Sequence, residues 1–316
     1  METMWDEIRS NKRKSILLMI ACSLVLVLLG LVIGLTMDRP IQGIIFGFVV
    51  ALFMSLIAFY NSDQIVLAAS RAKEVTHDDE PQLFNVVDEM RIASGLPMPK
   101  VYLIEESAPN AFATGRSPET ASVAITRGLM EKLSREELQG VMAHEMAHVR
   151  NLDIRFAMLL AVMVGSIALI ADFFLRYTFF AGVGRRGRSR SRSSGGGGGQ
   201  AQAIIMVIAI IFAILAPLVA KLIELAASRR REYLADASAV ELTRNPLGLA
   251  KALEKIAGDK APLEAATRAT QHLYIVNPVK ALRGGMGLFS THPPVLERIE
   301  RLRNMAHAPT QVEEGG

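Results

Sequence analysis

Cysteine is nearly absent from this sequence, which contains only Cys22 among its 316 residues. A single thiol cannot form a disulfide framework within the chain or a cysteine-ligated metal cluster, so both are excluded. Charge of either sign is also limited: 35 basic and 31 acidic side chains leave a net charge of +4. Because this excess is small and scattered, it does not indicate nucleic acid as a specific partner.

Hydrophobic residues, in contrast, make up 51% of the chain, and the mean hydropathy is +0.29. Intrinsic disorder is excluded as an overall description, because there is ample apolar material for burial. Soluble globular proteins rarely reach this hydropathy, so the composition favours a membrane protein. The mild basic excess then acts as an orientation signal in the membrane.

Two uncharged runs near the N-terminus, over 15–37 and 41–60, are each long enough to cross a bilayer as a helix. The short segment 38–40 separates them, so we expect a transmembrane helical hairpin over 15–60. A cleavable signal peptide is the alternative for the first run, but its apolar core would be only about 7–15 residues long.

Basic residues flank this hairpin on both outer sides and are rare between the two runs. The bias of cytoplasmic loops towards Lys and Arg therefore predicts that the basic N-terminus, 1–14, and the chain from residue 61 onward face the cytoplasm. The flanking basic residues are Arg9, Lys12, Arg13, Lys14, Arg71 and Lys73, with Arg39 alone between the runs.

A second hydrophobic helical pair is predicted within 156–225, at 156–175 and 201–220. Between them lies a basic Gly/Arg/Ser loop, 184–200, which its composition marks as a flexible linker. Whether the pair spans the bilayer stays open, but the number of crossings is even in either case. The segments 61–155 and 226–316 therefore share one side of the membrane. We interpret the arginine-rich loop as solvated or facing lipid headgroups, rather than as an RNA-binding element.

The chemistry of the chain is concentrated in a helix that begins after Ser134. Ser134 and Glu137 form the S-x-x-E pattern of a helix start. His144 and His148, four residues apart, share a face of this helix and can bind one metal ion, while Glu145 can reach a water molecule on that ion. An exposed surface cluster is the alternative, but apolar residues surround the motif, and buried imidazoles need a partner or a metal.

Catalytic zinc usually keeps three protein ligands and one open position. The segment 231–239 offers Glu232 and Asp236, which share one helical face. Glu232 can bind the metal, and Asp236 can accept a hydrogen bond from the outer nitrogen of a ligating histidine. Without the histidine motif, both would be read as members of a charged surface face.

A small sheet is expected within the catalytic segment 61–155. Residues 99–104 and 120–126 have the β-branched character of strands, and an edge strand there could bind an extended substrate by backbone pairing. The fold class that follows is mainly α with a small β-sheet, in a polytopic membrane protein with a zincin-like metalloprotease domain. The C-terminal helical segment, 226–316, supplies the third zinc ligand.

Together these motifs make the chain similar to membrane zinc metalloproteases of the HtpX heat-shock family, which are related more distantly to the CAAX prenyl proteases. The resemblance covers nearly the whole length. It is carried by Asn110–Gly115, by HEMAH at 144–148 followed by Val149–Asp153, by REYLADASA at 231–239, and by Ser290–Pro294 leading to Glu297, Arg298 and Ile299.

The resemblance implies one zinc ion per chain, bound by His144, His148 and Glu232, with Glu145 as the base. It also implies an endopeptidase of a bacterial inner membrane that cleaves damaged or misfolded membrane proteins at the cytoplasmic face. It places Asn110, Ala111, Phe112 and Ala113 along the substrate-binding cleft.

His292 and Arg298 are candidates for stabilising the transition state by resemblance, and Tyr233 is a candidate by chemistry alone. His77, His272 and His307 lie in polar or terminal settings and are interpreted as bystanders.

In the expected mechanism, Glu145 takes a proton from zinc-bound water as that water attacks the peptide carbonyl, and then delivers the proton to the leaving amine. Two other functions compete with this one. A catalytically idle membrane chaperone or adaptor with a structural zinc site would not need to keep Glu145. A transporter would be expected to show ionisable residues inside the two clear spans, which lack them.

Overall fold

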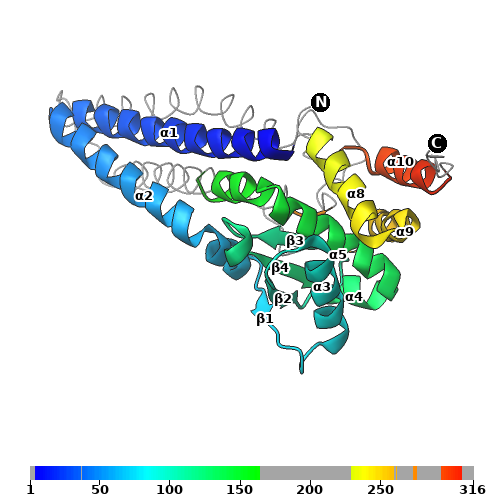
Figure 1. Cartoon of the computed structure of the whole chain (residues 1–316). Helices are drawn as coiled ribbons and strands as arrows, with labels where there is room; N and C mark the ends of the chain where they lie inside the picture. Colours follow the sequence, from blue (N-terminus) through cyan, green and yellow to red (C-terminus); the bar gives the residue numbers. More distant parts are fainter. Residues whose placement is uncertain are drawn as a thin grey trace, which may run out of the picture.

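The computed structural model describes residues 4–36, 38–163, 229–259, 261, 273–275 and 293–307. Over these ranges the chain is mostly helical and carries a small mixed sheet, which confirms the predicted fold class. Two long helices, α1 and α2, project from a part that holds the sheet and the shorter helices (Figure 1). Apart from 156–163, the predicted second hydrophobic pair and the basic loop 184–200 lie outside the described residues.

The predicted hairpin consists of α1 (Met4–Thr36) and α2 (Pro40–Ala69). Both helices are long and apolar enough to cross a membrane, at Arg9–Val32 and Pro40–Ala69. Large apolar side chains such as Leu17, Phe46 and Phe53 are exposed on them, as expected where lipid replaces water. From Met4 onward, the basic N-terminal segment forms the first turns of α1.

Glycines allow α1 and α2 to approach closely. A Cβ atom on Gly30 would lie 2.3 Å from the carbonyl oxygen of Gly43, and a Cβ atom on Gly43 would lie 2.2 Å from the carbonyl oxygen of Gly30. Small residues permit such backbone contact between membrane helices, where close packing takes the place of the hydrophobic effect. The hairpin therefore depends on the absence of side chains at this contact.

Gly43→Ala is expected to destabilise the folded protein by about 1–3 kcal/mol, because the added methyl group would push the two helix backbones apart. The measurement is the midpoint of thermal unfolding in detergent, followed by circular dichroism. Gly258→Ala is the matched control, since a Cβ atom there meets nothing within 4 Å. Equal midpoints for Gly43→Ala and wild type would contradict the close contact.

The sheet has the strand order β1-β2-β4-β3. Strands β2 (Lys100–Ile104) and β4 (Ser122–Thr126) run parallel and correspond to the predicted strands at 99–104 and 120–126. The short β1 (Lys73–Glu74) pairs antiparallel with β2. Strand β3 (Ala111–Thr114) pairs antiparallel with β4, and this order makes β3 an edge strand.

The side chains of β3 and β4 are buried, as are those of β2 after Lys100, and most of them are apolar. Side chains alternate between the faces along a strand. Val101 and Leu103 point to a core that includes residues of α3 and α5, whereas Tyr102 and Ile104 point to a second core shared with α1, α2 and residues 156–163. The sheet thus lies between the hairpin of α1 and α2 on one side and helices α3 and α5 on the other.

Helix α5 (Arg135–Arg150) is the central element of the compact part and contacts α3, α8, α9 and β3. It begins with the predicted capping box of Ser134 and Glu137. It approaches α9 closely, since a Cβ atom on Gly140 would lie 2.7 Å from the backbone nitrogen of Leu249. The other described helical segments are α3 (Pro81–Ser94), η1 (Pro118–Thr120), α4 (Arg127–Lys132), residues 153–163, α8 (Arg229–Thr243), α9 (Pro246–Gly258) and α10 (Val295–His307).

Candidate metal centre

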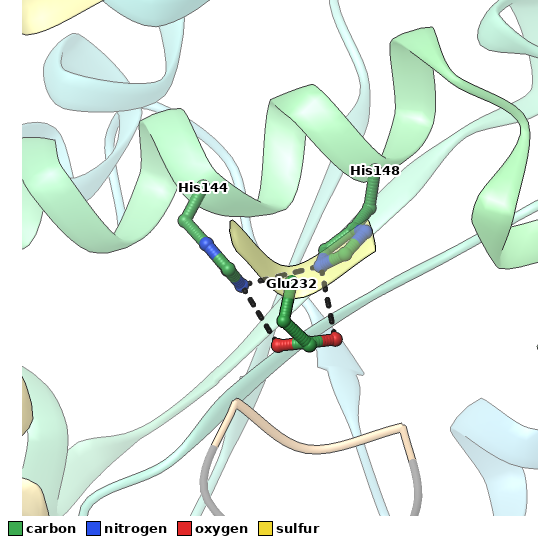
Figure 2. Close-up of side chains that lie close together, drawn as sticks. All are labelled: His144, His148 and Glu232. Atoms are coloured by element: carbon green, nitrogen blue, oxygen red, sulfur yellow. Dashed lines mark hydrogen bonds and ion pairs between the residues drawn. The ribbon is translucent and has the colours of Figure 1, made fainter. Parts of the chain in front are cut away.

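The histidine motif lies in the buried second half of α5. His144 and Glu145 are buried, and His148 is partly buried. The four-residue spacing places both imidazoles on one side of the helix, where they point towards the same region (Figure 2). The Nε2 atoms of His144 and His148 are 3.2 Å apart. Both rings can therefore present a nitrogen lone pair to a single ion.

Helix α8 contacts α5 and brings Glu232 to this pair (Figure 2). One carboxylate oxygen of Glu232 lies 3.7 Å from Nε2 of His144, and the other lies 3.7 Å from Nε2 of His148. The three potential ligand atoms all lie within 4.8 Å of one another. Residues separated by more than 80 positions in the chain thus converge on one point.

The spacing of these atoms can be compared with the geometry of a zinc site. Zn–N and Zn–O bonds of about 2.0–2.1 Å at tetrahedral angles place ligand atoms roughly 3.3 Å apart. The observed separations of 3.2 and 3.7 Å bracket that value. Two imidazole nitrogens and one carboxylate are also the ligand set of many catalytic zinc sites, with a fourth position left for water. These residues therefore fit a zinc ion.

On the side of its ring away from Glu232, His144 contacts Asp236 through Nδ1, and Arg298 binds that aspartate. Nδ1 of His144 lies 3.0 Å from Oδ1 of Asp236, and Arg298 donates to both oxygens of that carboxylate at 2.7 and 2.9 Å. Burial, followed by the nearby Arg298 cation, lowers the pKa of His144 to about 4. Because a neutral ring that donates from Nδ1 keeps its lone pair on Nε2, this arrangement prepares His144 as a ligand.

His148 has its own carboxylate partner, Asp153. Nδ1 of His148 lies 3.0 Å from Oδ2 of Asp153, just beyond the end of α5. Burial disfavours the charged ring, but the hydrogen bond to Asp153 and the charge of Glu232 outweigh burial and raise the pKa of His148 to about 9. A metal ion bound at Nε2 would displace a proton from this ring.

Glu145 lies beside the three potential ligands, against the edge of the sheet. Its carboxylate accepts a hydrogen bond from the backbone N–H of Ala113 in β3. Burial raises its pKa to about 7, although the charge of His148 opposes that rise. A carboxylate with a pKa near neutrality can both accept a proton and return it, as a general base requires.

The predicted substrate strand runs along β3, next to Glu145. Its residues, Asn110–Ala113, are buried in the described structure. The carbonyl oxygen of Ala111 accepts a hydrogen bond from the backbone N–H of Ile275 at 3.0 Å, and Tyr274 packs edge-on against Phe112. Part of the open side of β3 is therefore already covered by residues 273–275.

The other predicted site residues lie in different settings. Arg298 is fully buried and directs its donors to Asp236 and to the carbonyl oxygen of Ile275. The guanidinium group of Arg301 stacks on the ring of Tyr233, with its central carbon Cζ 3.7 Å from the centre of the ring. His292 and His272 lie outside the described residues. His77 and His307 are exposed; His77 hydrogen-bonds to the side chain of Asn85, and His307 hydrogen-bonds to the backbone carbonyl oxygen of Arg303.

Sequence reasoning did not assign a role to Asp153, and it did not foresee that Arg298 clamps Asp236. Asp153 lies five residues after His148, beyond the end of α5, so helical spacing gives no reason to pair them. Arg298 is 62 positions from Asp236, and only packing brings α10 onto α8. The only feature of the sequence that could have indicated Asp153 as a partner of His148 is the presence of a carboxylate shortly after the HEMAH motif.

Two histidines on one helix, a glutamate from a second helix and a buried glutamate beside them are the arrangement expected of a metallopeptidase metal centre. The comparisons with known proteins agree with this class. The model of peptidase family M48 matches residues 77–306. The protein called Protease HtpX homolog in Listeria monocytogenes is 47% identical over 304 residues, covering 96% of this chain and all of that protein. The chain therefore belongs to peptidase family M48 and is a metalloprotease.

Two further similarities were found. The Protease HtpX homolog of Dictyoglomus thermophilum is 42% identical, covering 96% of this chain and 95% of that protein. Among solved structures, S. mikatae Ste24p is similar with a TM-score of 0.46 and 18% identity, covering 95% of this chain and 66% of that chain.

Proposed function

We propose that this chain is a membrane-bound zinc endopeptidase with one ion held by His144, His148 and Glu232, and that it cleaves misfolded or damaged membrane proteins at the cytoplasmic face of a bacterial inner membrane. The observation that carries the proposal is the convergence of the three potential ligand atoms beside the buried carboxylate of Glu145. A structural zinc site would not need a fourth, proton-accepting group at this position.

Each residue of the candidate centre has a separate role in the proposed peptide hydrolysis. Bound zinc would act as a Lewis acid, activating water and polarising the peptide carbonyl. Glu145 accepts the proton of the attacking water and passes it to the departing amine. Asp236 and Asp153 fix the orientation of the two imidazoles through their Nδ1 atoms. Arg298 holds Asp236 and, being 3.4 Å from the ring of His144, adds positive charge close to the centre.

The orientation proposed for the site follows from the charges around the hairpin. Basic residues flank the two spans on their outer sides, which favours the cytoplasm for both ends. Asn11 of α1, among these basic residues, hydrogen-bonds to Asp153 beside the metal centre. The candidate centre therefore lies at the basic end of the hairpin, close to the membrane surface.

This position supports a substrate class. A centre beside the basic end of a membrane hairpin is well placed for polypeptide that emerges from the bilayer. Backbone pairing with β3 would select an extended chain rather than a particular sequence, which suits unfolded substrates. Residues 273–275 would have to leave the carbonyl oxygen of Ala111 for a substrate to pair along the full strand.

The test is cleavage of an unfolded membrane protein by the purified full-length chain in detergent, with and without a zinc chelator. We expect cleavage that stops on chelation and returns when zinc is added back. Glu145→Gln protein purified in the same way controls for contaminating peptidases. Stoichiometric zinc without cleavage of any unfolded substrate would instead support the chaperone or adaptor function.

A further inference from the structure

A buried polar cluster joins membrane helix α1 to the metal centre. Asn11 of α1 is 2% exposed, and its Nδ2 donates to Oδ1 of Asp153 at 2.7 Å and to the carbonyl oxygen of Asn151 at 3.3 Å. The other oxygen of Asp153 accepts a hydrogen bond from Nδ1 of His148 at 3.0 Å. An unbroken chain of hydrogen bonds thus runs from α1 to a proposed zinc ligand.

Asn11 lies on the face of α1 that packs against the rest of the protein. This face forms a buried stripe at helical spacing, while the adjacent Lys12 and Arg13 are exposed. Its other members are apolar or bond within their own helix, as Ser15 does to the carbonyl oxygen of Asn11. Within the described residues, the stripe consists of Asn11, Ser15, Leu18, Cys22, Leu26, Gly30 and Gly34.

The side-chain amide of Asn11 supplies a hydrogen-bond donor to the buried carboxylate of Asp153. A buried amide is costly unless its hydrogen-bonding groups find partners, and the two N–H bonds of this amide meet two acceptors. On the other side, Arg231 of α8 lies 3.5 Å from the side-chain oxygen of Asn11 and 3.7 Å from Oδ1 of Asp153. Asn11 and Arg231 together fix the plane of the carboxylate, and Oδ2 is then directed at His148.

We propose that Asn11 is a positioning residue for the metal centre, acting through Asp153 to hold His148 with Nδ1 donating and Nε2 directed towards the other two ligands. The inference rests on the proposed function, because it assigns His148 as a zinc ligand. As a consequence, the first membrane helix contributes a residue to the hydrogen-bond network around the metal. The affinity for zinc then depends on α1 packing in the position that brings Asn11 to Asp153.

A purely structural role for Asn11 would give a different result. If Asn11 only joined α1 to the catalytic part, its loss would lower stability but leave zinc affinity unchanged. A positioning role predicts weaker metal binding and an altered coordination geometry even in protein that is fully folded. Metal affinity and the absorption spectrum of a cobalt-substituted site therefore separate the two roles.

The experiment compares full-length Asn11→Leu with wild type in detergent. Leucine has a similar volume but no hydrogen-bonding group. We expect the zinc dissociation constant, measured by competition with a chelating dye, to rise about tenfold, the lower end of the effect of losing a direct partner of a metal ligand, because Asn11 acts through Asp153. The visible absorption bands of the Co²⁺-loaded protein should also shift. Ser15→Ala is the matched control, one turn away on the same buried stripe, and should behave like wild type.

A double-mutant cycle tests whether the effect passes through Asp153. In an Asp153→Ala background, Asn11→Leu should cause no further loss of zinc affinity, because its partner is already gone. Should Asn11→Leu fail to fold, Asn11→Ser removes the amide, leaves room for water and takes the same measurements. Unchanged zinc affinity and cobalt spectrum in the folded variant, or an undiminished effect without Asp153, would overturn the proposal.

The outcomes also separate this inference from the proposed function. Zinc affinity is measured without any substrate, so a wild-type protein that binds zinc but cleaves nothing would refute the endopeptidase and leave the role of Asn11 testable. Conversely, an active wild type with an equally tight site in Asn11→Leu would refute the role of Asn11 alone.

Discussion

Glu145→Gln is expected to slow peptide cleavage by about 10²–10⁴-fold, the usual contribution of a general base, while zinc stays bound. Glutamine is nearly the same size but cannot take a proton from the attacking water. The three proposed ligands are untouched, so the metal content per chain should equal that of the wild type. The measurements are the cleavage rate of an unfolded membrane protein and the zinc content by elemental analysis.

The matched control for this variant is Glu136→Gln, an exposed glutamate in the first turn of the same helix. Its cleavage rate should remain close to that of the wild type. If Glu145→Gln kept full activity with zinc bound, the assignment of Glu145 as the base would be wrong. If the variant lost both zinc and activity, Glu145 would be needed for metal binding rather than for proton transfer.

Glu232→Gln is expected to weaken zinc binding by more than about 100-fold, a larger effect than the roughly 10–100-fold typical of losing an outer partner. The amide carries no negative charge, so it is a poor replacement for a carboxylate on a divalent cation. Cleavage should fall in parallel with zinc occupancy and recover only in part at high zinc concentration. Dye competition for zinc and activity over a zinc titration measure both effects.

Glu241→Gln provides the control on the same helix, since Glu241 is exposed on α8, more than two turns beyond Glu232. Zinc affinity there should be unaffected. Wild-type zinc affinity in Glu232→Gln would mean that the third ligand is another group, and the proposed site would have to be rebuilt around the two histidines.

Local signals made much of the fold predictable. The uncharged runs identified the helical hairpin, and the S-x-x-E pattern placed the start of α5 at the observed capping box. The β-branched segments became β2 and β4 within about two residues of their expected ends, the usual uncertainty of such boundaries. In each case the information lies within a few neighbouring residues, through hydrogen bonding or burial of the local segment.

The N-terminal segment shows where such reasoning stops. Its four basic residues dominate the pattern over 1–14 and predict a cytoplasmic end, while no local pattern marks Asn11 for a role in the site. In the structure these residues belong to α1, and Asn11 is buried against Asp153, 142 positions away in the chain. Nothing in the local sequence distinguishes this asparagine from a solvated one.

For this protein, the sequence by itself determined the residue types and spacings that fit the chemistry: two imidazoles and a carboxylate base on one helix, and a glutamate and an aspartate on another. Helical periodicity alone places such groups on a common face. The tertiary structure decided which distant groups complete the site, through Asp236 on His144, Arg298 on Asp236, Asp153 on His148 and Asn11 on Asp153. These pairings depend on how α1, α8 and α10 pack against α5 and one another, and packing arises from the whole folded chain rather than from any one segment.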